Sequence, residues 1–136
     1  MIKCTVYGVP QPQGSMRAFI PKGWGRAVIT SNSPKLKPWR QQVAASALEA
    51  RDTLLGPGAE VWDGPISVTI DFFFERPKSV KSERKTTRPD VDKLLRGVFD
   101  ALTGILFKDD SQVVKCTATK QFGSPARAEV SVERIS

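Results

Sequence analysis

The chain has 136 residues, of which 40% are hydrophobic, and its 21 Lys and Arg against 14 Asp and Glu give a formal net charge of +7. This length suits a single domain, residues 1–136, and the hydrophobic content allows a packed core, which argues against global disorder. A small basic chain is typical of proteins with a polyanionic partner, nucleic acid first, although excess positive charge also serves solubility. The chain contains no histidine, which excludes Ser-His-Asp, Cys-His and histidine–zinc chemistry and leaves Asp, Glu, Lys or Tyr to do acid–base or metal work.

The cysteines and the N-terminus bear on where the protein works. Cys4 and Cys116 lie in strand-like segments and not in a CxxC pair, which argues against a zinc site and favours buried free thiols in a reducing cytosol. Strand-like residues begin at Ile2 with no signal-peptide apolar region before them, and no apolar run approaches the length of a membrane span. We therefore expect a cytoplasmic protein with no membrane partner.

Regular elements are predicted from apolar residues that recur every second residue in strands and every three or four residues in helices. In chain order these are a strand over 2–9, a β-hairpin with strands over 16–20 and 27–30, a helix over 39–51, a strand over 66–74, a helix over 91–105, and two strands over 113–122 and 128–135. Gly- and Pro-containing turns separate them, including the segment 56–58 that ends the first helix. The order β-hairpin-α-β-α-β-β predicts an α+β fold.

A basic loop precedes the second predicted helix. Residues 76–88 carry six cations against the single acid Glu83, a net charge of +5, and show no apolar periodicity. A solvated loop is the ordinary explanation of such a run, but its position just before a group of acids favours contact with phosphates. The DNA contacts predicted here and along the N-terminal half are Lys22, Arg26, Lys35, Lys37, Lys78, Lys81, Arg84, Lys85 and Arg88. Trp24, in the predicted hairpin turn, is either a base-stacking side chain or part of a small local core.

Aspartates flank the second predicted helix. Asp90 and Asp92 open it, and Asp109 and Asp110 follow its end. Hydrolysis of a phosphodiester needs an activated water and a stabilised leaving oxygen, and Mg²⁺ held by carboxylates and retained waters supplies both. Two aspartates at i, i+2 converge on one or two metal ions where the backbone between them is extended. The structural alternative is that Asp90 is an N-cap and Asp92 a first-turn acid favoured by the helix dipole.

The same helix has one core face and one polar face. Asp92, Arg96 and Asp100 recur at i, i+4 and i+8 on the polar face. This row is either a ladder of ion pairs or an arrangement that places a cation beside metal-binding carboxylates.

Three motifs in this region resemble the RusA family of Holliday-junction resolvases. They are Arg88-Pro89-Asp90-Val91-Asp92-Lys93-Leu94, Phe99-Asp100-Ala101-Leu102 and Asp109-Asp110-Ser111-Gln112-Val113-Val114, similar to the R-x-D-x-D-N-L, F-D-A-L and D-D-x-Q-V segments of that family. The resemblance is close over residues 88–120. It implies a RusA-like domain with a mixed β-sheet and two main helices. It also implies a homodimeric endonuclease, dependent on Mg²⁺ with Mn²⁺ as an alternative ion, that makes paired nicks in four-way DNA junctions. Such enzymes are common in phages and prophages.

The resemblance also assigns roles to individual residues. The family's essential, metal-binding aspartates match Asp90, Asp92 and Asp110. Its essential lysine is Arg96 here, and because arginine keeps its charge but does not readily donate a proton, we expect Arg96 to act electrostatically. Lys93 stands where the family usually has asparagine, and Lys120 matches a strand lysine; both are further predicted DNA contacts.

The length of the second helix poses a geometric problem. A helix from Val91 to Ile105 would be about 21 Å long, with Asp90 at its start and Asp110 beyond its end. Asp110 joins the pair only if the helix breaks early, if the chain doubles back, or if it comes from the second subunit of a two-fold dimer. Alternatives to a junction-resolving enzyme are a non-catalytic basic DNA-binding module, a nuclease for other branched DNA, and a small structural protein whose charge is incidental.

Overall fold

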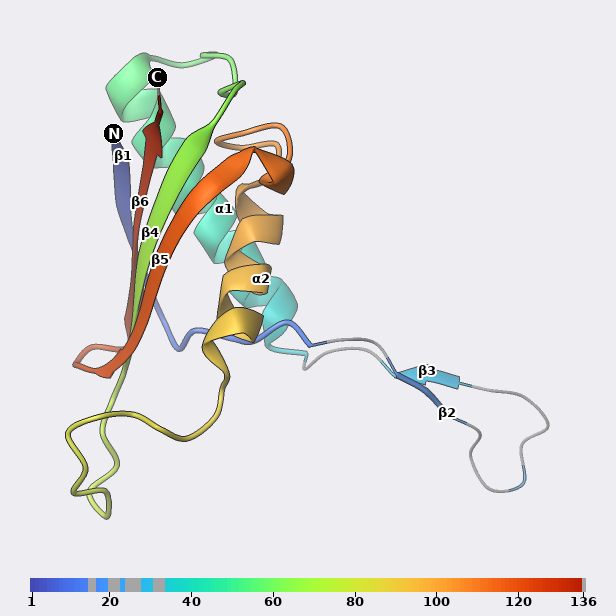
Figure 1. The fold of residues 1–136 in the computed structure, drawn as a ribbon, viewed down its shortest axis with the longest axis vertical. Helices are drawn as coiled ribbons and strands as arrows, with labels where there is room; N and C mark the ends of the chain where they lie inside the picture. Colours follow the sequence, from blue (N-terminus) through green and yellow to red (C-terminus); the bar gives the residue numbers. More distant parts are fainter. Residues whose placement is uncertain (15–16, 20–22, 24–27, 31–33, 136) are drawn as a thin grey trace.

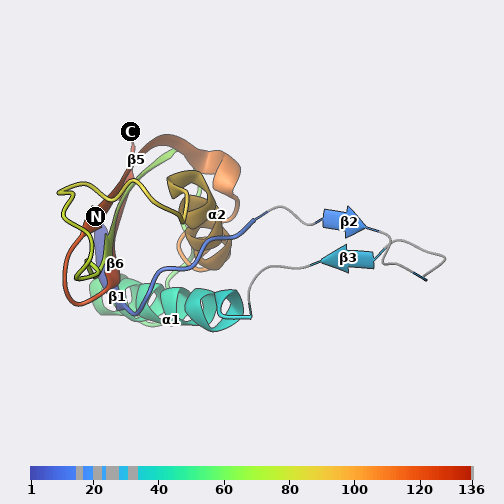
Figure 2. The same cartoon turned by 90° about the horizontal axis from the view of Figure 1, so that it is seen from below.

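The computed structural model describes residues 1–14, 17–19, 23, 28–30 and 34–135. Its body is a four-stranded sheet with the order β1-β6-β4-β5, and two helices cover one face of it (Figures 1 and 2). The predicted α+β fold, with two main helices and a mixed sheet, is confirmed. In the described part of the chain, no helix is long and apolar enough to cross a bilayer. A homodimer stays a prediction.

The elements follow the predicted order. They are β1 (Ile2–Tyr7), β2 (Arg17–Phe19), β3 (Val28–Thr30), α1 (Leu36–Leu55), β4 (Ile66–Phe74), α2 (Val91–Leu102), the short 3₁₀ helix η1 (Asp110–Gln112), β5 (Val113–Phe122) and β6 (Arg127–Arg134). The bounds predicted for β4 and β5 are confirmed, and those of β6 shift by one residue. The segment 76–88 contains neither helix nor strand, as predicted.

The first helix begins earlier and ends later than predicted. We expected it to start after Pro38, but it starts at Leu36 and runs to Leu55. Proline is tolerated in the first turn of a helix because its missing N–H would have no intrahelical partner there. Leu36 is 3% exposed, so burial of its side chain favours the earlier start. The helix ends four residues later than predicted, at Leu55, directly before the predicted stop residue Gly56, whose N–H donates to Asp52 O at 2.9 Å.

The second helix is three residues shorter than predicted. It ends at Leu102, and the chain then turns through Gly104, which has a φ of 84° that side-chain-bearing residues rarely adopt. The N–H of Gly104 donates to Phe107 O at 2.7 Å, which closes the turn. Leu106 and Phe107 are 1% and 0% exposed, so the turn returns two large apolar side chains to the core. Their burial outweighs the continued helical pattern of the sequence.

Strand directions explain the position of α2. β1 runs antiparallel to β6 and β6 antiparallel to β4, whereas β4 and β5 are parallel. Parallel neighbours need a crossover connection, and the chain between β4 and β5 supplies it with the basic loop 76–88 and α2. The core lies between the helices and the sheet: in β4 it takes every second side chain, including Val68, Ile70 and Phe72, each 0% exposed.

β2 and β3 form an arm separate from the body. They pair antiparallel, with Ala18 opposite Ile29, which confirms the predicted hairpin strands. Figures 1 and 2 show the pair standing well away from the sheet and from both helices. Lys22 and Arg26, predicted to contact DNA, and Trp24 between them lie outside the described residues.

Candidate active site

The first two aspartates lie at the amino end of α2. Asp90 occupies the N-cap position with extended dihedral angles (φ −75°, ψ 141°), but its side chain makes no capping hydrogen bond. Asp92 lies in the first turn, and its carboxylate is 3.7 Å from the ammonium of Lys93. Both aspartates are exposed. The alternative of a purely structural N-cap is therefore weakened for Asp90, because its carboxylate does not satisfy the helix N–H groups.

Two lysines hold the segment that leads into Asp90. The ammonium of Lys120, from β5, donates to Thr87 O at 2.8 Å and to Pro89 O at 3.0 Å. The ammonium of Lys85 donates to Thr87 Oγ1 at 3.1 Å and lies 4.9 Å from the ring centre of Phe74. Partial burial, and secondly the charge of Lys120, lower the pKa of Lys85. Two mutually repelling cations beside Asp90 make this segment a favourable place for an anion.

The D-D-x-Q-V motif builds the turn η1. Asp109 is its N-cap and accepts from Ser111 N at 2.8 Å. The side-chain oxygen of Gln112 accepts from the backbone N–H groups of Lys108 and Asp109, at 2.8 and 2.9 Å. Its amide nitrogen donates to Trp62 O at 3.0 Å and to Gly64 O at 2.9 Å. Gln112 thus ties the turn to the loop before β4, a structural role that sequence reasoning missed because its partners are about 50 residues away.

Asp110 is left exposed by this arrangement and has acidic neighbours. Its pKa is raised, first by a hydrogen bond with Asp109, then by slight burial and by the negative charges of Asp109 and Asp100. The pKa of Asp109 is lowered, first by the hydrogen bond from the backbone N–H of Ser111. Asp110 therefore lies in a negative field that a bound cation would relieve.

Asp110 does not join Asp90 and Asp92 within one chain. They lie at opposite ends of α2, whose 12 residues span about 18 Å. Within the ranges that the structure describes, no group of three or more His, Cys, Asp or Glu could hold a metal ion. The helix does break early, as one prediction allowed, but the returning strand β5 carries Lys120 back to Asp90 and leaves Asp110 at the far end (Figure 1).

The remaining predicted site residues lie on the surface where they are described. Lys35, Lys37, Lys78, Lys81, Arg84, Arg88 and Arg96 are exposed, and Lys85, Lys93 and Lys120 are half-buried. Contact of these side chains with DNA stays a prediction.

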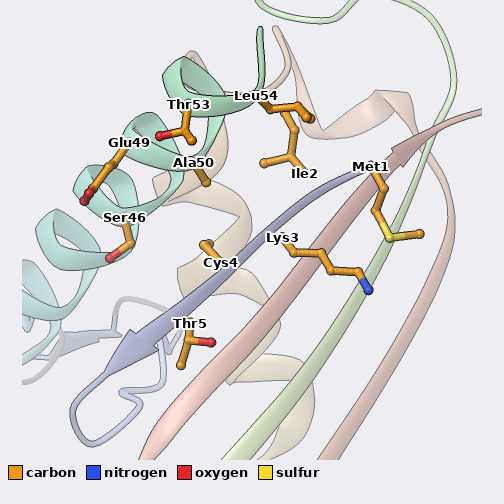
Figure 3. Close-up of a pocket in the computed structure, with 10 residues that line it drawn as sticks. All are labelled: Met1, Ile2, Lys3, Cys4, Thr5, Ser46, Glu49, Ala50, Thr53 and Leu54. Carbon is orange, nitrogen blue, oxygen red and sulfur yellow. The ribbon is translucent and has the colours of Figure 1, made fainter. Parts of the chain in front are cut away.

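A separate hollow lies between β1 and α1, with Lys3, Cys4 and Glu49 in its lining (Figure 3). Burial raises the pKa of the Cys4 thiol to about 11, so this cysteine stays protonated at neutral pH and is a poor nucleophile. Cys116, on β5, is exposed, so the expectation that both thiols are buried is wrong for it. None of the predicted site residues lines the hollow, so it adds nothing to the aspartate site.

The lysine that anchors the approach to Asp90 can be tested by substitution. Lys120→Met removes both hydrogen bonds to the Thr87 and Pro89 carbonyls, and we expect the free energy of unfolding to fall by about 1–3 kcal/mol. Urea unfolding measures this change. Lys115→Met, an exposed position on the same strand, is the control and should change stability by no more than about 0.5 kcal/mol. Equal effects of the two substitutions would contradict an anchoring role.

Comparison of the sequence with known proteins identifies a family. The sequence model of the family described as "Endodeoxyribonuclease RusA" matches residues 9–133. The chain is 35% identical over 148 residues to "Uncharacterized protein YqaN" of Bacillus subtilis (strain 168), covering 99% of this chain and 97% of that protein. It is 30% identical over 73 residues to "Crossover junction endodeoxyribonuclease rusA" of Lactococcus phage r1t, covering 52% of this chain and 56% of that protein. The chain therefore belongs to the RusA family of endodeoxyribonucleases, which makes it a nuclease of the hydrolase class and confirms the family predicted from its sequence.

Proposed function

We propose that this protein is a Mg²⁺-dependent endonuclease that resolves four-way DNA junctions by paired nicks. The observation that carries the proposal is the pair of exposed carboxylates of Asp90 and Asp92 beside a segment held by two lysines. Carboxylates favour a hard divalent cation, and the adjacent ammonium groups favour a phosphate. The phage relative described as a crossover junction endodeoxyribonuclease supports a branched DNA substrate.

The residues present fit a Mg²⁺ ion. Their donor set is oxygen-only, the Asp90 carboxylate is not used in capping, and Asp110 has an excess of negative charge around it. Asp90, Asp92 and Asp110 would hold one or two ions. Bound Mg²⁺ would lower the pKa of a water and stabilise charge on the leaving oxygen. Mn²⁺ prefers similar oxygen ligands and is an alternative ion.

A two-fold dimer would complete the site. A two-fold axis across the middle of α2 exchanges the two ends of the helix between subunits, because the helices would then run antiparallel. Asp110 of the partner subunit would approach Asp90 and Asp92 of the first subunit, and two equivalent sites would result. This arrangement overcomes the separation of about 18 Å without distorting α2. It also supplies two active sites for two nicks.

The cations around Asp90 would bind and orient the DNA. Lys120 has three N–H donors and uses two on backbone carbonyls, so a third is available for a phosphate oxygen. Arg96 is exposed one helical turn after Asp92 and would stabilise the negative charge that develops on the scissile phosphate. The exposed cations of the basic loop 76–88 would contact the DNA backbone on either side.

Catalysis is tested by removing one charge. Asp92→Asn should lower cleavage of a synthetic four-way junction in Mg²⁺ by at least about a hundredfold, since a metal ligand is weakened, while junction binding is retained. Cleavage and gel-shift assays, with and without Mg²⁺, measure both. Asp52→Asn, on α1, is the control and should leave cleavage unchanged. Binding without any Mg²⁺-dependent cleavage by the wild type would instead favour a non-catalytic DNA-binding module. Faster cleavage of flaps or replication forks than of four-way junctions would indicate a nuclease for other branched DNA.

The shared site is tested by mixing two inactive homodimers under subunit exchange. In a mixture of Asp92→Asn and Asp110→Asn, half of the dimers are mixed, and each mixed dimer has one unaltered composite site of two. Nicking should recover to roughly a quarter of the wild-type rate. A mixture of Asp90→Asn and Asp92→Asn is the control, because it leaves no unaltered site. If the first mixture stays as inactive as the second, the three aspartates do not act across subunits.

The basic loop is tested through salt dependence. Neutralising Arg84 and Lys85 to Gln should weaken junction binding and reduce the slope of log K against log salt by roughly 0.9 for each phosphate that the loop no longer neutralises. Fluorescence anisotropy without Mg²⁺ measures the slope. The control is the double variant Lys3→Gln and Lys115→Gln, on strands β1 and β5. It removes the same amount of charge outside the loop and should change the slope less. An unchanged slope for the loop variant would remove residues 76–88 from the DNA interface.

A further inference from the structure

The arm formed by β2 and β3 joins the body through residues 9–14, the arm root, and this segment lies across α2. Pro10 is buried and residues 11–14 are half-buried. Figure 2 shows the chain passing from β1 along the helices before it reaches β2. The arm root therefore contacts the helix that presents Asp90 and Asp92.

Two hydrogen bonds from Gln13 fix this contact. Its backbone N–H donates to Lys93 O at 3.0 Å, and its side-chain amide donates to the carboxylate of Asp100. Lys93 and Asp100 are seven residues apart and lie on one face of α2. The side-chain oxygen of Gln13 is buried with no partner among the described residues, so the donor hydrogen bond fixes the orientation of the amide.

Gly97 lies between these two hydrogen bonds and permits the close approach. A Cβ at this position would stand 3.3 Å from Gln11 O and 3.5 Å from Leu36 Cδ1. Leu36 is the first residue of α1, directly after the segment that returns from β3. The arm root and the first residue of α1 thus meet α2 at Gly97, which is buried.

The contact face of α2 also adjoins both groups of aspartates. At one end, Lys93 pairs with Asp92 at 3.7 Å. At the other end, Asp100 is close enough to Asp110 for its negative charge to act on that carboxylate. Gln13 consequently holds the arm against a helix face that leads to the two ends of the proposed active site.

We propose that Gln13 is a positioning residue that couples the arm root to α2, so that this contact sets the position of the catalytic aspartates Asp90 and Asp92. The coupling rests on the proposed nuclease function. It predicts that disruption of the Gln13–Asp100 hydrogen bond lowers turnover of bound junction more than it lowers binding.

A charge swap tests the coupling. Gln13→Glu places a carboxylate against Asp100, and we expect single-turnover cleavage at saturating junction to fall by about tenfold, with the dissociation constant within about twofold of wild type. Asp100→Asn alone should keep turnover within roughly threefold of wild type, because the Gln13 amide can still donate to an Asn oxygen although one negative charge near Asp110 is lost. In the double variant the new amide at position 100 donates to the new carboxylate at position 13, and turnover should return to within roughly threefold of wild type. Gln11→Glu, in the same segment, is the matched control.

A second variant distinguishes loss of the contact from unfolding of the protein. Gly97→Ala favours the helix itself by about 1 kcal/mol, yet its methyl group presses on Gln11 O and Leu36. We expect turnover to fall while the thermal midpoint stays close to that of wild type. Wild-type turnover in Gln13→Glu, or a defect in Gln13→Glu that Asp100→Asn does not restore, would overturn the coupling.

Amide hydrogen exchange separates this proposal from the nuclease function. In the absence of Mg²⁺, the junction-bound wild type should show slower exchange in residues 91–102 than junction-bound Gln13→Glu, because the Gln13 hydrogen bonds hold α2 in place. This readout does not depend on cleavage. If the wild type fails to cleave but α2 is protected through Gln13, the coupling is supported and the proposed reaction is wrong. If the wild type cleaves and α2 exchanges equally fast in both proteins, the coupling is wrong and the reaction stands.

Discussion

The length of α2 is the constraint on which the arrangement of the site depends. Its 12 residues span about 18 Å and carry Asp90 and Asp92 at one end, while Asp110 follows the other. No carboxylate side chain bridges such a distance, and the helix cannot shorten further without exposing Leu94, Val98 and Leu102, each 0% exposed. Packing of one face of α2 therefore fixes the separation, and any metal site that needs all three aspartates has to bring two helices together.

Because β4 and β5 are parallel, lysine side chains and not Asp110 approach Asp90 within one chain. Since α2 is part of the crossover between these strands, β5 returns alongside it in the opposite direction and ends near its amino terminus. Lys120 then meets the carbonyls of Thr87 and Pro89, and Lys85 packs over Phe74 beside them. A single chain thus combines a carboxylate pair with a cationic rim, which suits a phosphate next to a metal ion.

Sequence patterns predicted the elements better than the contacts between them. The bounds of β4 and β5 were predictable because apolar alternation continues until the turn residues, whereas α2 ended three residues early because burial of Leu106 and Phe107 decides the turn. The aspartates were found from their motifs. The partners of Lys120 and Gln112 were not predictable, since hydrogen bonds to backbone 31 to 50 residues away leave no periodic signal. The DNA contacts remain predictions, and those at Lys22 and Arg26 lie outside the described residues.

Electrostatics gives an independent reason to expect the two ends of α2 to meet across a dimer. The amino end is surrounded by Lys85, Lys93 and Lys120 and by the positive pole of the helix dipole. At the carboxyl end, Asp110 is repelled by Asp100 and Asp109, and the helix dipole adds further negative potential. The three lysines and the positive helix pole at the amino end exceed the two carboxylates of Asp90 and Asp92, so this end attracts the acidic carboxyl end of a second copy. Antiparallel apposition of two α2 helices would therefore reduce repulsion at both sites at once, and bound Mg²⁺ and phosphate would complete the neutralisation.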